Sequence, residues 1–162
     1  MVSVGIAPID GLSINGSAAQ TSDETGTSGP GGKEAGVSAN LSAKYTIGQV
    51  SVGYTEGGYQ PAVASGEIAY YENQFYGIQF DVNDAISVSY NIDKSDKNQR
   101  VKVAQGSTTG TKTSTEMEQK SLQLAYTTGG ATIGIAQVEV DNADYSAGKT
   151  ETQSVVSLAI SF

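Results

Sequence analysis

The sequence predicts an all-β protein made of antiparallel strands, and three features of the chain support this fold class. Gly, Ser, Thr and Tyr dominate the 162 residues, with 20 Gly and 9 Tyr, and long stretches with a helical period are absent. Apolar and polar residues alternate in short segments, as in strands with one apolar and one wet face. Gly, Asn and Asp interrupt these segments at turn-like positions. The length suits a single domain over residues 1–162.

The composition excludes several classes of function. The chain has no Cys and no His, which removes thiol nucleophiles, disulfides, the usual zinc ligands and any imidazole base. We therefore expect neither an enzyme nor a bound metal or cofactor. The 9 basic and 17 acidic residues give a net charge of −8, which argues against a nucleic-acid partner. No apolar run approaches the roughly 20 residues of a membrane helix.

The alternating segments give about eight strands. A further short segment, residues 2–6, is expected to be the remnant of a ninth strand. The first residues lack the basic start and apolar block of a secretory signal, so we expect a mature form or a fragment. The expected strands run over residues 12–18, 37–45, 50–55, 68–82, 86–93, 122–126, 133–140 and 152–162.

Two places break the alternation. Glu72 and Gln74 fall in the apolar phase of their strand, which predicts either a bulge there or an apolar part that begins near Phe75. Val138 and Val140 fall on the phase opposite to the apolar residues before them. This predicts a second bulge, near residues 136 and 137.

The connections alternate strictly between short and long, which favours a transmembrane β-barrel. The short ones are residues 7–10, 47–49, 83–84 and 128–130, and the long polar ones are residues 20–34, 56–66, 94–118 and 141–151. Bacterial outer-membrane barrels have short turns on the periplasmic side and longer loops outside. We therefore expect an antiparallel transmembrane β-barrel in the bacterial outer membrane.

Aromatic residues are expected to form two girdles at the membrane interfaces. The set near the short turns is Tyr45, Phe80, Tyr126 and Phe162, and the set toward the long loops is Tyr54, Tyr59, Tyr70 and Tyr90.

The last strand carries a second indication of this class. Val156, Leu158, Ile160 and Phe162 share one face of the strand, and the printed chain ends on the aromatic residue. This ending resembles the assembly signal of bacterial outer-membrane β-barrel proteins. The resemblance implies that the barrel-assembly machinery is a partner.

Longer segments extend the resemblance over nearly the whole chain. A-K-Y-T-I-G-Q-V-S-V-G-Y-T, K-S-L-Q-L-A-Y-T-T-G-G-A-T-I-G-I-A and the final V-S-L-A-I-S-F resemble the carboxy-terminal half of a Gram-negative trimeric general porin. The resemblance implies passive diffusion of small hydrophilic solutes or ions through a water-filled lumen. It also implies a barrel of about sixteen strands, of which this chain supplies half, and a trimer surrounded by outer-membrane lipid and lipopolysaccharide.

The polar phase of the strands gives the expected pore-lining residues, which are mostly small. These are Ser38, Asn40, Ser42, Lys44, Ser51, Thr55, Gln79, Asp81, Ser87, Ser89, Asn91, Gln123 and Ser157.

Three alternatives stay open at this stage. A small closed barrel of about eight strands would have its interior filled by side chains, and would have a structural or adhesive role through its outer loops. A surface β-sandwich would bury the same apolar faces against each other. Two copies of the chain could also close one barrel, since a half barrel leaves unpaired edges in lipid.

The basic residues are concentrated in one stretch: six of the nine lie in residues 94–120. This stretch is either a contact for lipopolysaccharide or a solvated loop of mixed charge.

Overall fold

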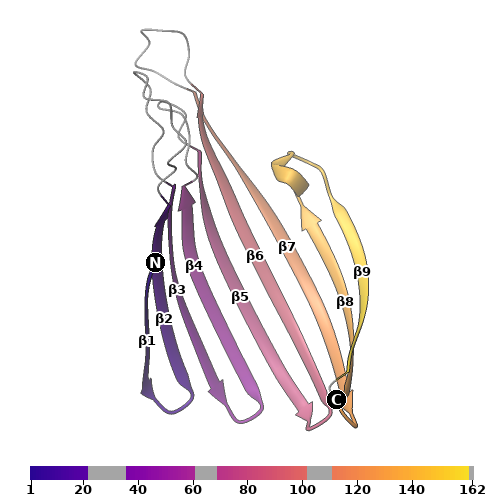
Figure 1. Ribbon diagram of the computed structural model, residues 1–162. Coiled ribbons are helices and arrows are strands. Elements are labelled where there is room, and N and C mark those ends of the chain that lie inside the picture. Colours follow the sequence, from indigo (N-terminus) through magenta and orange to yellow (C-terminus); the bar gives the residue numbers. More distant parts are fainter. Residues whose placement is uncertain (22–35, 61–68, 102–110, 161–162) are drawn as a thin grey trace.

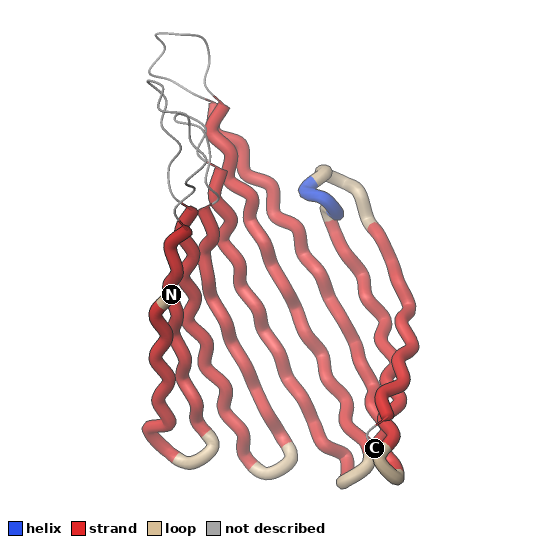
Figure 2. The backbone as a smooth tube through the Cα atoms, in the orientation of Figure 1, coloured by secondary structure: helices blue, strands red, loops and turns tan. Residues whose placement is uncertain are grey.

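The computed structural model describes residues 1–21, 36–60, 69–101 and 111–160, and within them the chain forms one antiparallel sheet of nine strands. Each strand pairs with its neighbours in sequence, and the sheet is a single curved layer (Figures 1 and 2). The strands are β1 (Val2–Ile9), β2 (Leu12–Thr21), β3 (Gly36–Ile47), β4 (Val50–Gln60), β5 (Ala69–Asn83), β6 (Ile86–Val101), β7 (Thr111–Thr128), β8 (Ala131–Asp141) and β9 (Glu151–Ile160). A short 3₁₀ helix, η1 (Ala143–Tyr145), lies between β8 and β9.

The short connections are tight turns gathered at one end of the sheet (Figure 2). Gly11, Gly48, Gly129 and Gly130 all have positive φ, a conformation that glycine adopts without a steric penalty. The predicted Asn83 turn is also present, because its side-chain oxygen accepts 2.9 Å hydrogen bonds from the N–H groups of Ala85 and Ile86. These turns set the register of the sheet.

Gly11 is the turn residue whose replacement should cost most. Its φ is +76°, and a Cβ there would collide with the backbone oxygen of Thr46 on β3. Gly11→Ala should therefore lower the free energy of unfolding by more than the roughly 1–2 kcal/mol of a left-handed alanine alone. The free energy of unfolding is measured by urea titration, in which gel mobility distinguishes the folded from the unfolded chains.

Gly129→Ala is the matched control for this prediction. Its φ is +55°, and nothing lies within 4 Å of the added Cβ. Gly129→Ala should lower the free energy of unfolding only by the penalty of a left-handed alanine backbone. Equal losses in the two variants would show that contact with Thr46 is unimportant.

The strands next to the long connections run further than the sequence indicated. Residues 94–118 were expected as a polar loop, and this expectation is wrong for most of them, because β6 continues to Val101 and β7 begins at Thr111. Likewise, β4 continues to Gln60 where a loop was expected from residue 56. Both faces of these extensions are polar, so apolar alternation does not reveal them. The connection expected over residues 141–151 is present between β8 and β9.

Neither predicted bulge occurs. The pairing of β5 with its neighbours is continuous through Glu72 and Gln74, so the apolar part of this strand does begin close to Phe75. The pairing of β8 is also continuous from Ala131 to Val140. The register shifts instead in β5 between Asp81 and Asn83, and in β1.

The edges of the sheet are β1 and β9. The segment expected as a remnant is a full strand, paired with β2 from Val2 to Ile9. Within the described residues, the strand order ends at β1 on one side and at β9 on the other, and no ladder joins these two strands. The sheet is therefore an open wall and not a closed eight-stranded ring.

The described part of the chain has almost no buried core. Among the described residues, the buried ones are Ala143, which is 3% exposed, Ser121, which is 4% exposed, and Gly36. Large apolar side chains such as Leu158 and Ile78 are well exposed. A water-soluble protein of this length would bury such side chains. No helix in the described residues is long and apolar enough to cross a membrane.

Candidate functional site

One face of the sheet carries a continuous apolar belt. The cross-strand pairs join apolar residues in rows, such as Tyr45 with Val52, Val52 with Ile78, and Val88 with Leu124. Leu124 and Ile135 continue the belt, and Ile133 meets Leu158 on β9. Most of these side chains are between about two-fifths and two-thirds exposed, and Val88 is half-buried, so the belt is an outer surface of the sheet.

The belt ends on each of six consecutive strands, and its last apolar position shifts by two residues toward the turns between β6 and β7 and again between β7 and β8. Its last apolar positions toward the long connections are Tyr54, Tyr76, Ile92, Leu122, Ile135 and Val156, and the next positions on the same face are Glu56, Gln74, Lys94, Lys120, Gln137 and Ser154. A boundary of this kind matches the border between membrane hydrocarbon and headgroups. We call it the polar border.

Two tyrosines at the polar border have the geometry of interfacial aromatics. The rings of Tyr54 and Tyr76 lie 5.1 Å apart, and their hydroxyls donate 2.9 Å hydrogen bonds to Glu56 and Gln74. Each ring thus lies on the apolar side while its hydroxyl reaches the polar side. Tyr76 was missing from the predicted girdle. Tyr59 was wrongly included, because its pairing with Ser38 places it on the opposite face.

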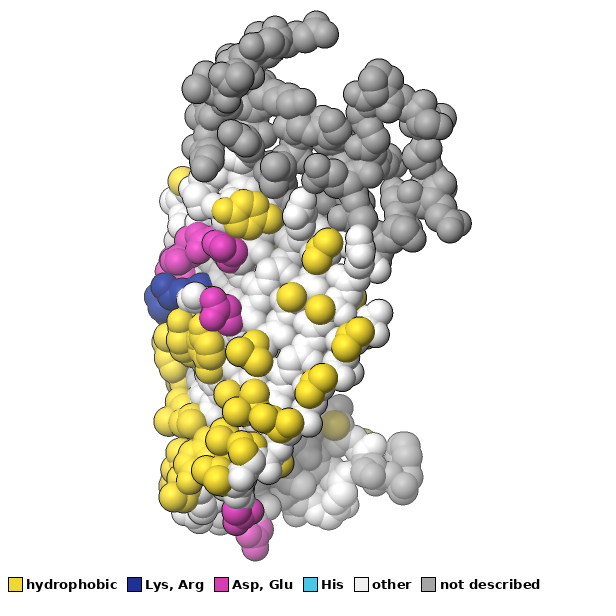
Figure 3. All heavy atoms as spheres, turned by 90° about the vertical axis from the view of Figure 1, so that its left-hand side faces the viewer, with side chains coloured by type: hydrophobic (Ala, Val, Ile, Leu, Met, Phe, Trp, Pro, Cys, Tyr) yellow, Lys and Arg dark blue, Asp and Glu magenta, His cyan; other side chains and the backbone are white. Residues whose placement is uncertain are grey.

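Charged side chains lie beyond the polar border, as Figure 3 shows for one side of the molecule. Lys94 pairs with Glu118 at 2.9 Å and Glu116 at 3.4 Å, and Lys120 pairs with Glu118 at 2.6 Å and Asp141 at 3.7 Å. The two lysines expected in a basic loop therefore belong to a mixed-charge network on strands. The pairs of Lys94 with Glu116 and Glu118 join β6 to β7 beyond the belt.

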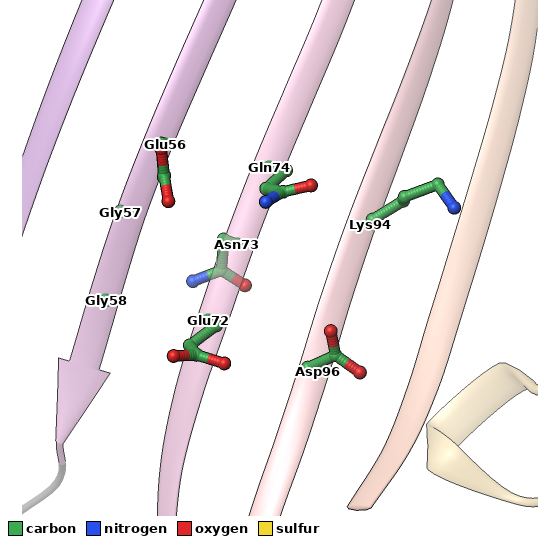
Figure 4. Close-up of a pocket in the computed structure, with 8 residues that line it drawn as sticks. All are labelled: Glu56, Gly57, Gly58, Glu72, Asn73, Gln74, Lys94 and Asp96. Atoms are coloured by element: carbon green, nitrogen blue, oxygen red, sulfur yellow. The ribbon is translucent and has the colours of Figure 1, made fainter.

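A shallow hollow of about 360 Å³ lies beside this network (Figure 4). Carboxylates and amides from β4, β5 and β6 surround it, and Lys94 is the single basic residue among the described residues that line it. The described residues include no group of three or more side chains placed to hold a metal ion. The hollow is a polar surface feature outside the belt.

The opposite face of the sheet is polar and concave. The cross-strand register places every predicted pore-lining residue on it, for example Ser42 beside Thr55, Gln79 beside Ser89, and Asp81 beside Ser87. Ser38 and Asn40 share this face, beside Tyr59 and Gly57. The alternation in the sequence was therefore sufficient to group these residues.

Two hollows follow this face and show its curvature. The first, of about 480 Å³, spans β2 to β6, and Lys44 is the only charged side chain among the described residues that line it. The second, of about 320 Å³, spans β5 to β9 and is lined by residues that include Gln123 and Ser157. Gln79 and Ser89 line both hollows. A third, of about 420 Å³, includes Asp81 and Ser87 at the turn end.

The connection between β8 and β9 adds a feature that the sequence did not reveal. We call residues 142–150 the strap. Its first residue, Asn142, donates a 2.9 Å hydrogen bond to the carbonyl of Glu116 on β7. The Tyr145 hydroxyl and the Ser95 hydroxyl share a 2.7 Å hydrogen bond. The rings of Tyr145 and Tyr71 lie 5.7 Å apart. Ser95 and Tyr71 belong to the concave face of β6 and β5, so the Tyr145 side chain reaches across β7.

The strap has an unusual backbone. Asn142, Asp144 and Tyr145 have φ of 52°, 56° and 57°, and they are the non-glycine residues with positive φ in the described part of the chain. Each such residue costs of order 1–3 kcal/mol and persists only where its surroundings impose the conformation.

An ion-pair cluster closes the strap. Lys149 pairs with Asp144 at 2.6 Å and with Glu151 at 2.7 Å. Hydrogen bonding to Asp144, and then to Glu151, raises the pKa of Lys149 above its ordinary value. The same bond to Lys149 holds the pKa of Asp144 below its ordinary value. Lys149 and Asp144 are therefore both charged at neutral pH.

The predicted assembly strand faces the membrane side. Val156, Leu158 and Ile160 lie on the apolar belt, with 75%, 63% and 57% exposure. Phe162 lies outside the described residues. These three residues share one face of the strand, as the sequence predicted. The role of the strand in assembly stays a prediction.

Comparison with known proteins supports the fold. No protein-family model matches the chain, and no curated protein matches it. Among solved structures, the chain is similar to OmpT (in-vitro folded), an outer membrane protein of Vibrio cholerae, with a TM-score of 0.65 and 14% identity over 96% of this chain and 51% of that one. A weaker likeness, with a TM-score of 0.40 and 11% identity, links 91% of the chain to 96% of the Yersinia pestis outer membrane protein Ail in a phospholipid bilayer nanodisc.

These findings confirm the predicted fold class. The nine-stranded antiparallel sheet is that of a transmembrane β-barrel, and the expected outer-membrane location agrees with the similarity to OmpT. The chain spans about half the length of the OmpT structure. The similarity to OmpT supports the outer-membrane barrel fold. It does not extend to the predicted trimeric general porin.

Proposed function

We propose that the chain forms part of the wall of an outer-membrane pore through which small hydrophilic solutes or ions diffuse passively. The observation that carries this proposal is the two-sided sheet, with an apolar belt on one face and a concave face of small polar side chains on the other. A wall between lipid and water requires this arrangement.

The dimensions of the concave face support an open lumen. Small barrels of about eight strands have interiors filled by side chains. Here Ser, Thr, Asn and Gly predominate on the concave face and leave hollows of about 480 and 320 Å³ along the sheet. Phe75 also lines the larger of these hollows, but both hollows remain open, and water can occupy them.

A structural or adhesive barrel is the second candidate function. The β6–β7 hairpin favours it, because its strands continue in register past the polar border as far as Val101 and Thr111. A rigid extension of this kind is suited to contact with a partner outside the cell. The open order of the strands disfavours the small closed barrel that this function was expected to have.

The expected partners follow from the same surfaces. The apolar belt would contact outer-membrane lipid, and the charged network around Lys94 and Lys120 would lie at headgroup level, where lipopolysaccharide provides phosphates. We propose the barrel-assembly machinery as the partner of β9 and a trimer of complete barrels as the assembly. No catalytic role is proposed for any residue.

The test is planar-bilayer conductance of the native assembly extracted from outer membranes in detergent, with a heat-modifiability gel beside it. The proposal predicts stepwise, long-lived open channels. A heat-modifiable band without conductance would overturn it in favour of the adhesive barrel. Extraction without detergent would exclude a membrane barrel altogether.

A further inference from the structure

We propose that the strap is a constriction element on the lumen side of the wall, and that Tyr145 is the residue that holds it there. This inference rests on the proposed pore function and deepens it, because it assigns the residue that limits the size of the solutes.

The strap occupies a step in the edge of β7. The pairing of β7 with β8 ends at Glu118 and Asp141, while β7 itself begins at Thr111. The strap begins in this gap, since Asn142 bonds to Glu116 and η1 contacts β7. Figure 1 shows η1 beside the upper part of β7. A connection placed there can extend outward to solvent or turn onto the concave face.

The contacts of Tyr145 show that the strap turns onto the concave face. Its hydroxyl meets Ser95, which also donates a 2.6 Å hydrogen bond to Asn73. Its ring packs against Tyr71, which is stacked with Tyr59 at 6.3 Å. The Lys97 ammonium lies 5.6 Å from the Tyr145 ring centroid, within the range of a cation–π interaction. One side chain thus joins the strap to β5 and β6.

The backbone of the strap indicates that this position is imposed by these contacts. Asp144 and Tyr145 adopt left-handed conformations that L-residues rarely adopt without support. Asn142 supplies part of that support, since its side-chain oxygen accepts a 2.8 Å bond from Gly148. The Lys149 cluster adds a second tie at the base of the strap. Backbone hydrogen bonds, such as that from Ala143 to the Lys149 carbonyl, also hold the strap together. Among these ties, the Tyr145 side chain is the one that reaches β5 and β6.

The position of the strap determines its effect on a solute. It lies beyond the polar border, and its Tyr145 side chain lies over the concave face, in contact with Ser95 and Tyr71. The strap therefore narrows the path near the loop end. Releasing it should widen the pore for large solutes more than for small ions.

The first test compares single-channel conductance and sugar uptake in Tyr145→Ala, Tyr145→Phe and wild type, in the native assembly. Tyr145→Ala should raise conductance about twofold and admit larger sugars, because a wider constriction conducts better. Tyr145→Phe keeps the ring and loses only the bond to Ser95, so its effect should be smaller. Tyr70→Ala, on the opposite face, is the control and should leave both readouts unchanged.

The second test needs no conductance and separates this inference from the pore proposal. Because the chain has no Cys, nitroxide labels can be placed on Ala147→Cys and Ser38→Cys. In the wild-type background, the distance between the two labels should have one narrow distribution. Tyr145→Ala should broaden this distribution and shift it to longer distances. If the assembly conducts but Tyr145→Ala changes neither readout, the strap inference is wrong. If the assembly does not conduct, the pore proposal fails, and the label distances alone decide whether Tyr145 holds the strap.

Discussion

Replacing Leu124 by arginine is expected to destabilise the inserted barrel by about 2–4 kcal/mol, the cost of a cation at the lipid-facing midplane. Leu124 lies in the middle of the apolar belt, between Leu122 at the polar border and Tyr126 near the turns. Its cross-strand neighbours are Val88 and Ile135, so no counter-charge is close. Urea titration in lipid vesicles, read by gel mobility, measures the change.

Gln123→Arg is the matched control for this prediction. Gln123 is the adjacent residue on the same strand, but it lies on the concave face beside Ser89 and Ala136. An arginine there would project into water. We expect little change in the free energy of unfolding, and a shift of the pore's ion preference toward anions. Equal destabilisation by both variants would mean that the two faces do not differ as described.

No β1–β9 cross-link is expected between copies of the chain, because the strand count is odd. In a nine-stranded meander, β1 and β9 run in the same direction. Two copies with the same orientation in the membrane would therefore have to join through parallel pairs, whereas bacterial barrels are antiparallel throughout. Closure in an antiparallel manner requires an odd number of further strands between β9 and β1.

The cross-linking experiment uses cysteines on the concave face of each edge. Ser3→Cys and Ser157→Cys, placed in separate copies and treated with a short bifunctional reagent, should give no dimer. The positive control joins Gly134→Cys to Ser157→Cys within one chain, since these positions are paired and a Cβ on Gly134 would lie 2.6 Å from the Ser157 hydroxyl. Efficient dimer formation by the edge pair would refute the parity argument and restore closure by two copies.

The sequence predicted the part of the fold that the membrane constrains. In the belt each strand has one lipid-facing and one wet face, so the period of two is strict and places Leu124 and Gln123 correctly. The turn residues at Gly48, Asn83 and Gly129 were likewise recognisable, because each has a local chemical requirement. The first turn was expected over residues 7–10, but β1 continues to Ile9 and the turn lies at Asp10 and Gly11. The concave set from Ser38 to Ser157 followed from the same alternation.

Beyond the polar border the same signal disappears, and there the predictions were wrong. Both faces are polar from Lys94 to Gln99, so a paired strand looks like a polar loop in the sequence. Strand formation there is supported by cross-strand charges, such as Lys94 with Glu118, that only the register reveals. Val138 and Val140 appeared to change phase for the same reason, since the outer face of β8 becomes polar at Gln137. Tyr145 contacts Tyr71, which lies 74 positions earlier in the sequence. No local pattern can show such a contact.

If the sheet is a membrane wall, one of its faces contacts lipid and the other contacts water. Nitroxide labels placed one at a time on residues 122–127 of β7, in lipid vesicles, distinguish the two faces. Labels on Leu122, Leu124 and Tyr126 should collide with oxygen dissolved in the bilayer, and labels on Gln123, Ala125 and Thr127 should collide with a polar nickel complex. If the even-numbered labels were instead shielded from both reagents, the apolar face would be packed against protein, and the chain would not be a membrane wall.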